Sequence, residues 1–445
     1  TSPHPVRLCG TLFAVRVVAM RPHVAEKPAT IPERRAMQVE EQKVEASALR
    51  VGMYICRLDR PWTETDFPLQ GFLVQTLEDI SRVAALCRHV WIDVEKSIGL
   101  GTANLLQRLG FRRERHDGTL LPEPAPYPNT VTLAEETRRA GPAWDDARVF
   151  VTRCIDDIRA GRRVAVEALV ETIQPVVASV VRNPDAFFWL DALRRRDGYA
   201  YSHAINCCAL AASFGRHLGF PREMLVDLAA GGMLMDMGMA ALPEDLPGQS
   251  KPLDEAARSA MSEHVALGLS KLQESGLANP AVVEMIAGHH ERHDGTGYPN
   301  GAVGLDIPLT ARMLGIVDSY DAMCSERSYR AAMSRHHALQ SLYRHRDELY
   351  QAELLEQFSQ ALGVYPTGSL VELSTGEVAV VMAQNLARRL FPRITVLTHP
   401  DKSIDHAFPQ IDLWSDRDPV TGNRRSIARA LPTGAYGLEL SEFFL

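Results

Sequence analysis

The feature that most constrains the fold is a long run of helical apolar spacing between residues 187 and 362. Segments such as YSHAINCCALAASF, VVEMIAGHHERH and LTARMLGIVDSYDAM place apolar residues three and four positions apart, and glycine and proline clusters separate them. Successive amphipathic helices bury their apolar faces by packing on one another. The sequence therefore predicts a mainly α protein with an all-helical bundle at residues 186–365.

Shorter regions with other patterns flank this bundle. LRVGMYICRL and VWIDVE are strand-like and enclose the helical LEDISRVAALCRH, which indicates a small α+β module. The prolines of LPEPAPYPNT indicate a linker, and SLVELSTGEVAVVMAQ and RITVLTHP are typical of strands. The predicted divisions are a disordered tail at 1–36, the α+β module at 37–115, a proline-rich linker at 116–142, connecting helices at 143–185 and a strand-rich extension at 366–445.

Charge and cysteine content exclude several classes of partner. The formal net charge is -7, which gives no case for binding duplex nucleic acid. No run approaches the roughly 18 apolar residues of a membrane span, so no membrane association is expected. The seven cysteines show no CxxC pairing, as is usual for reduced thiols. We therefore expect a cytoplasmic protein.

The helical run also contains residues that are able to bind metal ions. A single histidine in a helix is usually an ordinary core or surface residue, and Asp236 and Asp318 are equally interpretable as structural acids. Several such residues on different helices favour a metal site, because bundle metal sites are built from the inward side chains of facing helices. The predicted ligands are His203, Asp236, His264, His289, His290 and Asp318.

The segment HHERHDGTGYP, at residues 289–299, resembles the signature of the HD-GYP family of bacterial metal-dependent phosphohydrolases. YSHAIN, EHVALG, VDSYDAM and RSYR match in the expected order, and the resemblance covers about residues 187–363. Residues 44–96 also resemble a small accessory domain of unknown function that precedes HD-GYP domains. The resemblance implies hydrolysis of cyclic di-GMP at a site with one or two divalent ions, with iron or manganese expected.

The resemblance also implies how the ligands divide between two metal positions. One position matches in full, with His264, His289, His290 and the bridging Asp236. The other shares Asp236 and has His203 and Asp318, but Met235 stands where the family has the histidine of its HD pair. A thioether is a poor ligand for a hard divalent ion, so we expect this position to be weakened or empty. Met239 replaces the family's phosphate-binding lysine, and Tyr199 replaces the acid of a rarer third metal position.

Further roles follow from the same resemblance. Asp236, His290 and Glu291 are expected to act in catalysis, with Glu291 supporting the ligating imidazoles. Arg327 and Arg330 match a phosphate-binding pair, although without the resemblance two solvated arginines are equally expected. The loop at the site mouth comprises Asp294, Gly295, Gly297, Tyr298 and Pro299. In relatives it is proposed to contact diguanylate cyclase (GGDEF) domains.

Two functions remain open from the sequence. The first is metal-dependent hydrolysis of the 3',5'-phosphodiester of cyclic di-GMP, weakened by the losses at Met235 and Met239. The second is a catalytically inactive module that binds cyclic di-GMP or a partner protein. A homodimer is compatible with both.

Overall fold

The computed structural model divides the chain into two units, Thr1–Gln38 and Val39–Leu445. The structure describes residues 41–61, 65, 67, 71–74, 76–93, 97, 102–111, 120, 122, 124–194, 199–243, 246, 254–325, 332–385, 388–418 and 421–444. All of these lie in the second unit, and the disordered tail predicted at 1–36 lies outside them.

The first described element group is a small α+β module, as predicted. Its strands form an antiparallel sheet in the order β1-β4-β2-β3. Helix α1 begins with a capping box, in which the Thr76 hydroxyl accepts from the Asp79 amide and the Asp79 carboxylate accepts from the Thr76 amide. The elements are β1 (Glu41–Glu45), the 3₁₀ turn η1 (Ala46–Ala48), β2 (Tyr54–Leu58), β3 (Phe72–Leu73), α1 (Leu77–Leu86) and β4 (His89–Asp93).

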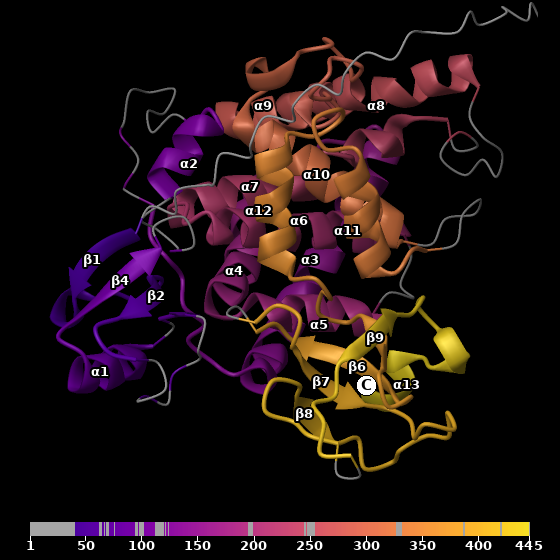
Figure 1. Ribbon diagram of the computed structural model, residues 1–445. Coiled ribbons are helices and arrows are strands. Elements are labelled where there is room, and N and C mark those ends of the chain that lie inside the picture. The colour runs from indigo at the N-terminus through magenta and orange to yellow at the C-terminus, as the bar shows by residue number, and fades with distance from the viewer. Residues whose placement is uncertain are drawn as a thin grey trace, which may run out of the picture. The chain divides into compact units, whose positions relative to one another are not determined.

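Helices fill the next part of the chain, which confirms the predicted bundle (Figure 1). Their buried faces form one continuous apolar core. In chain order the elements are α2 (Thr102–Arg108), α3 (Leu133–Arg159), η3 (Val166–Ala168), α4 (Leu169–Arg182), α5 (Pro184–Arg194), α6 (Tyr199–His217), α7 (Arg222–Leu234), η4 (Met237–Ala241), α8 (Glu255–Glu274), α9 (Pro280–Gly288), η5 (Gly304–Asp306), α10 (Leu309–Cys324), α11 (Arg335–Arg344) and α12 (Ala352–Leu362).

Helix α3 corrects the predicted limits of the linker. It begins at Leu133, after the Thr132 hydroxyl accepts a hydrogen bond from the Glu135 amide, and it continues through Pro142. A proline inside a helix costs about 3 kcal/mol. Here that cost is offset by burial, because Trp144 and the face around it pack into the core. The proline content therefore led to a linker that was predicted too long, because its predicted end at residue 142 lies well inside α3.

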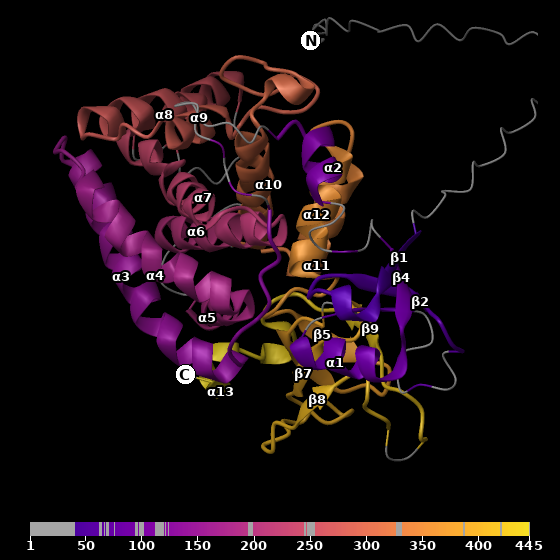
Figure 2. The ribbon, with the colours of Figure 1, turned by 90° about the vertical axis from the view of Figure 1, so that its left-hand side faces the viewer.

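The centre of the bundle is formed by α6 and α7, which run together (Figure 2), with α10 on α6 and α9 on α7. This arrangement brings the ends of α7 and α9 close to the N-terminal part of α6 and to the middles of α8 and α10. By length and composition, one described stretch, Arg222–Ala241, is apolar enough to cross a membrane, and 61% of its window is buried inside the protein.

The C-terminal region forms an antiparallel sheet in the order β8-β7-β6-β5-β9, which confirms the predicted strand-rich extension. Its apolar side packs on Trp189 and Leu193 of α5. On the same helix, the buried Asp185 carboxylate accepts hydrogen bonds from the Thr367 hydroxyl at 2.6 Å and the Gln384 amide at 3.2 Å. The elements are β5 (Leu370–Leu373), β6 (Val378–Ala383), β7 (Arg393–Val396), β8 (Gln410–Asp412), β9 (Ile427–Ala430), η6 (Ala435–Gly437) and α13 (Leu440–Phe444).

Candidate metal centre

Five helical elements contribute the six predicted ligands to one region of the bundle. His203 lies on α6, His264 on α8 and Asp318 on α10. Asp236 follows the end of α7 and precedes η4, and the pair His289 and His290 follows the end of α9. The apolar faces of these helices form the core. The polar ligand side chains meet where the ends of α7 and α9 approach α6, α8 and α10.

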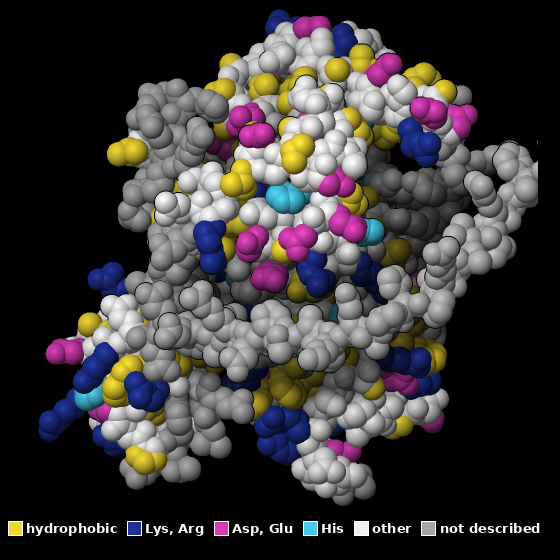
Figure 3. Space-filling view, turned by 45° about the horizontal axis from the view of Figure 1, so that its top comes forward, with side chains coloured by type: hydrophobic (Ala, Val, Ile, Leu, Met, Phe, Trp, Pro, Cys, Tyr) yellow, Lys and Arg dark blue, Asp and Glu magenta, His cyan; other side chains and the backbone are white. Residues whose placement is uncertain are grey.

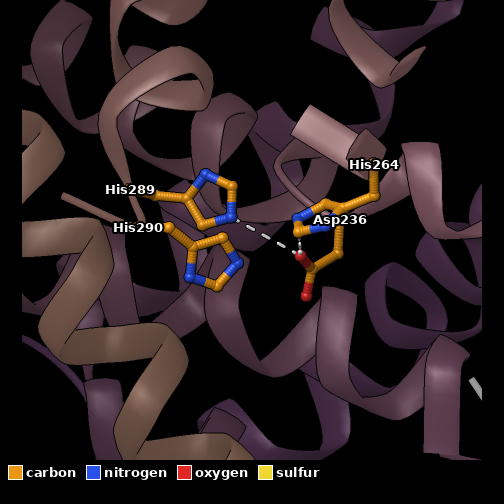
Figure 4. Close-up of side chains that lie close together, drawn as sticks. All are labelled: Asp236, His264, His289 and His290. Atoms are coloured by element: carbon orange, nitrogen blue, oxygen red, sulfur yellow. Dashed lines mark ion pairs between the residues drawn. The ribbon is translucent and has the colours of Figure 1, made fainter. Parts of the chain in front are cut away.

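The first group of side chains comprises Asp236, His264, His289 and His290, whose ligand atoms all lie within 4.8 Å of one another. Figure 4 shows His264 and His289 turned toward the Asp236 carboxylate. Its Oδ1 atom lies 3.3 Å from His264 Nε2 and 3.5 Å from His289 Nε2. This is the set that the family resemblance assigns to the complete metal position.

The proton positions on His264 and His289 leave lone pairs for a cation. The Nδ1 atom of each ring lies 2.7 Å from the backbone carbonyl three residues earlier, Met261 for one and Ile286 for the other. A carbonyl oxygen only accepts, so each Nδ1 carries the proton. Both Nε2 atoms are buried and make no hydrogen bond of good geometry, although Asp236 Oδ1 faces them at 3.3 and 3.5 Å. A buried acceptor of this kind is costly unless something binds it, and a divalent cation fits.

The second group is His203, Asp236 and Asp318. His203 Nε2 lies 3.0 Å from Asp236 Oδ2 and 3.3 Å from Asp318 Oδ1. Asp236 thus faces the first group with one oxygen and the second group with the other. A bridging carboxylate between two cations has this arrangement, and mixed imidazole and carboxylate donors suit iron, manganese or zinc.

Both carboxylates remain ionised in this setting. Burial raises the pKa of Asp236, but the imidazoles of His203, His264 and His289 outweigh it and hold the pKa well below its usual range. Burial likewise raises the pKa of Asp318, and the His203 hydrogen bond outweighs it and brings the pKa to about 2. Burial, aided by the neighbouring His289, lowers the pKa of His290 well below its usual value. A neutral imidazole and charged carboxylates are the forms that bind metal.

A close approach of backbones places Asp236 against α8. A Cβ atom on Gly238 would lie 1.9 Å from the His264 carbonyl oxygen and 2.6 Å from the Gly268 nitrogen. Only glycine permits this contact, so η4 seats directly on α8. The Asp236 carboxylate and the His264 ring are thereby fixed on facing segments.

The predicted mouth loop folds back onto the ligand pair. A Cβ atom on Gly297 would lie 2.4 Å from the His290 carbonyl oxygen, and Gly295 has a φ of 81°. The peptide bond between Tyr298 and Pro299 is cis. The Tyr298 ring lies against the His290 ring, tilted by 31° with centroids 4.6 Å apart. Asp294 closes the turn by accepting from the Thr296 amide and hydroxyl.

Glu291 differs from its expected role. Its two carboxylate oxygens accept hydrogen bonds from the backbone amides of Asn300 at 2.8 Å and Ala302 at 3.0 Å. Backbone carbonyls, rather than Glu291, fix the proton positions on His264 and His289. The physical reason is that the chain turns back after Pro299 and presents amides that need acceptors. Glu291 therefore anchors the loop.

Sequence reasoning missed two buried polar residues beside His203. Asp321 Oδ2 lies 2.8 Å from His203 Nδ1, and the Asn206 side-chain amide donates to Asp321 Oδ1 at 3.2 Å. The spacing was a usable signal, because Asp321 follows Asp318 by three positions and so shares its face of α10. Cys207 also approaches His203, but burial raises the pKa of its thiol to about 12, so it remains a poor ligand.

Of the remaining positions singled out in the sequence, the structure describes some and not others. Met235 is 1% exposed and belongs to the apolar core, and Met239 is half-buried. Arg327 and Arg330 lie outside the described residues, as does the side chain of Tyr199. On the described part of the face in Figure 3, lysine and arginine side chains are scattered among acidic ones, without a continuous basic patch.

Comparison with known proteins gives a consistent result. A family model described as "HD domain" matches residues 188–354, and the model of a domain of unknown function, DUF3391, matches residues 41–169. The chain is 29% identical over 360 residues to "Cyclic di-GMP phosphodiesterase PA4108" of Pseudomonas aeruginosa, covering 80% of this chain and 84% of that protein. It is 32% identical over 186 residues to "Cyclic di-GMP phosphodiesterase response regulator RpfG" of Xanthomonas campestris, covering 40% and 49%.

Residues 188–354 form an HD domain, and its relatives support the HD-GYP type. Among solved structures, this chain matches Bd1817 of Bdellovibrio bacteriovorus with a TM-score of 0.43 and 15% identity, covering 73% of this chain and 99% of that one. Within the family signature, Met235 and Met239 remain the departures noted in the sequence. The HD-GYP assignment agrees with a metal-dependent centre built from the two groups above.

Proposed function

We propose that this protein hydrolyses the 3',5'-phosphodiester of cyclic di-GMP at a metal centre formed by the two groups. The observation that carries the proposal is the convergence of His203, His264 and His289 on the two oxygens of Asp236. The names of the relatives support the substrate, since both are cyclic di-GMP phosphodiesterases.

The chain's own residues supply the framework for this reaction. Two bound cations would lower the pKa of a water molecule and neutralise the phosphoryl oxygens. Asp236 holds both positions together through its two oxygens. Among the described residues, no backbone carbonyl holds a ring nitrogen of His290 as in His264 or His289, and its ring lies against the tilted Tyr298 ring. His290 therefore forms the side of the first metal position that lies next to the mouth loop.

The two positions differ in their ligands. The first has three imidazoles and a carboxylate, whereas the second has one imidazole and two carboxylates. Because Met235 packs in the core, it adds no hard donor to the second position. We propose iron or manganese as the metal, with the first position filled more tightly than the second.

An assay of purified protein tests this proposal. Protein prepared without oxygen and loaded with Fe²⁺ or Mn²⁺ should convert cyclic di-GMP to a linear dinucleotide or GMP, as separated by chromatography. His290→Ala should abolish turnover. His345→Ala removes a half-exposed histidine that pairs with Glu348 and should leave turnover unchanged. Binding of cyclic di-GMP without turnover, at full metal occupancy, would show an inactive binding module instead.

Several finer expectations stay predictions. They are contact of the mouth loop with diguanylate cyclase (GGDEF) domains, a homodimer, phosphate binding by Arg327 and Arg330, and a cytoplasmic location.

A further inference from the structure

In three histidines of the centre, the Nδ1 atom has a hydrogen-bond partner, but the kind of partner differs. His264 and His289 donate to neutral backbone carbonyls of their own helices. His203 instead faces a carboxylate from another helix, with Nδ1 2.8 Å from Asp321 Oδ2. The one imidazole of the second metal position is therefore the one paired with a full negative charge.

Asp321 is itself fixed in place. It is 1% exposed, and the Asn206 side-chain amide donates to its Oδ1 atom at 3.2 Å. The Ser325 hydroxyl donates to its Oδ2 atom at 3.3 Å. Donors on both oxygens hold the carboxylate plane, so the acceptor presented to His203 has a defined direction.

This contact affects His203 in two ways. A carboxylate accepts only, so Asp321 keeps a proton on Nδ1, and Nε2, which faces Asp236 and Asp318, is the ring nitrogen that would give up its proton to bind a cation. Its charge also stabilises positive charge on the ring, which makes Nε2 a stronger donor to a cation. In metal sites, losing such a partner typically lowers metal affinity by about 10–100-fold.

We propose that Asp321 is a positioning residue that strengthens His203 as a ligand, and so sustains the metal position that lacks a histidine at Met235. This inference rests on the proposed metal centre. Its rival is a structural role, in which Asp321 merely fastens α10 to α6. The two differ in what happens to the second metal position when only the charge is removed.

The first experiment needs no metal. Histidine ring ¹⁵N resonances of the metal-free full-length protein report which nitrogen carries the proton. We expect His203 to carry a proton on Nδ1 in the wild type, and a second on Nε2, since carboxylates face both ring nitrogens. In Asp321→Asn, the charge beside Nδ1 is removed, so Nδ1 should lose its proton while Nε2 keeps its own. An unchanged His203 signal in this variant, with the fold retained, would overturn the inference.

The second experiment measures Mn²⁺ binding to the metal-free full-length protein by calorimetry. Wild type should show a tight and a weaker class of site, and Asp321→Asn should weaken only the weaker class, by about 10–100-fold. Asp185→Asn is the matched control, because it removes another buried carboxylate that serves the C-terminal sheet. It should change neither class.

The outcomes separate this inference from the proposed function. No Mn²⁺ binding by wild type would contradict the metal centre itself. Binding by wild type that is identical in Asp321→Asn, or equally weakened in both classes, would overturn only the role of Asp321. If Asp321→Asn does not fold, Ser325→Ala removes one hydrogen bond to the same carboxylate and should weaken the second class by about fivefold. An unchanged second class there would equally overturn the role.

Discussion

Gly238 lies against the backbone of His264 so closely that a Cβ atom would come within 1.9 Å of the His264 carbonyl oxygen. Gly238→Ala must therefore push η4 away from α8. Since Asp236 directly precedes η4, its carboxylate would move away from the imidazoles. We expect lower metal content, measured by elemental analysis, and a loss of unfolding free energy of about 1–3 kcal/mol.

The matched control for this change is Gly141→Ala in the interior of α3. The nearest atom to its Cβ would be an Arg194 guanidinium nitrogen at 3.9 Å, an ordinary contact. Alanine in a helix interior should raise stability by about 0.5–1 kcal/mol. If Gly238→Ala and Gly141→Ala bind the same amount of metal and change the unfolding free energy equally, the η4 contact does not have this role.

Met235→His restores a nitrogen donor at the position where the family has one. Alone, a histidine in this apolar surrounding should lower the unfolding free energy of the metal-free protein, because a buried polar group lacks a partner. With Mn²⁺ present, we expect more metal per chain, and more activity when Met239→Lys is added. Met233→His is the comparison, since Met233 is equally buried on α7. If both variants hold the same metal as wild type, the assignment of the second position is wrong.

Glu291→Gln tests the anchoring of the mouth loop. The carboxylate accepts from two backbone amides, whereas a carboxamide has one oxygen and turns its NH₂ group toward the other amide. We expect faster hydrogen exchange at Asn300 and Ala302, with metal content unchanged. Glu284→Gln, on the exposed side of α9, should leave exchange at these amides as it is. A loss of metal with unaltered exchange would show instead that Glu291 supports the metal-binding imidazoles, as the resemblance implied.

His217 gives the stability a pH dependence. Burial, aided by the nearby Arg389, lowers the pKa of His217 to about 4, and its Nε2 lies 3.0 Å from the side-chain Oε1 of Gln357. An unfolded histidine has a pKa of about 6.5, so the unfolded chain takes up the proton first. Its contribution to stability is complete above about pH 6.5 and falls between 6.5 and 4. Urea unfolding across this range should show a steeper fall for wild type than for His217→Gln. Parallel curves would exclude the effect.

The sequence predicted most of this architecture, because helix spacing and strand alternation are local properties. It also brought the six ligands into one hypothesis, since the family motifs carry them. The role of Asp321 was not predictable in the same way, because it depends on α10 lying beside α6. Glu291 was misjudged for a similar reason: its partners belong to the return path of a loop. The start of α3 was missed because tertiary burial outweighs the local preference of Pro142.

The hydrogen bonds from Thr367 and Gln384 to Asp185 mean that the strand-rich extension is not a removable appendage. A chain shortened to end at residue 365, where the sequence places a division, would leave the Asp185 carboxyl group on α5 without these two donors. It would also expose Trp189 and Leu193 to water. Such a truncated protein should be prone to aggregation, and the catalytic bundle is better isolated with its C-terminal sheet attached.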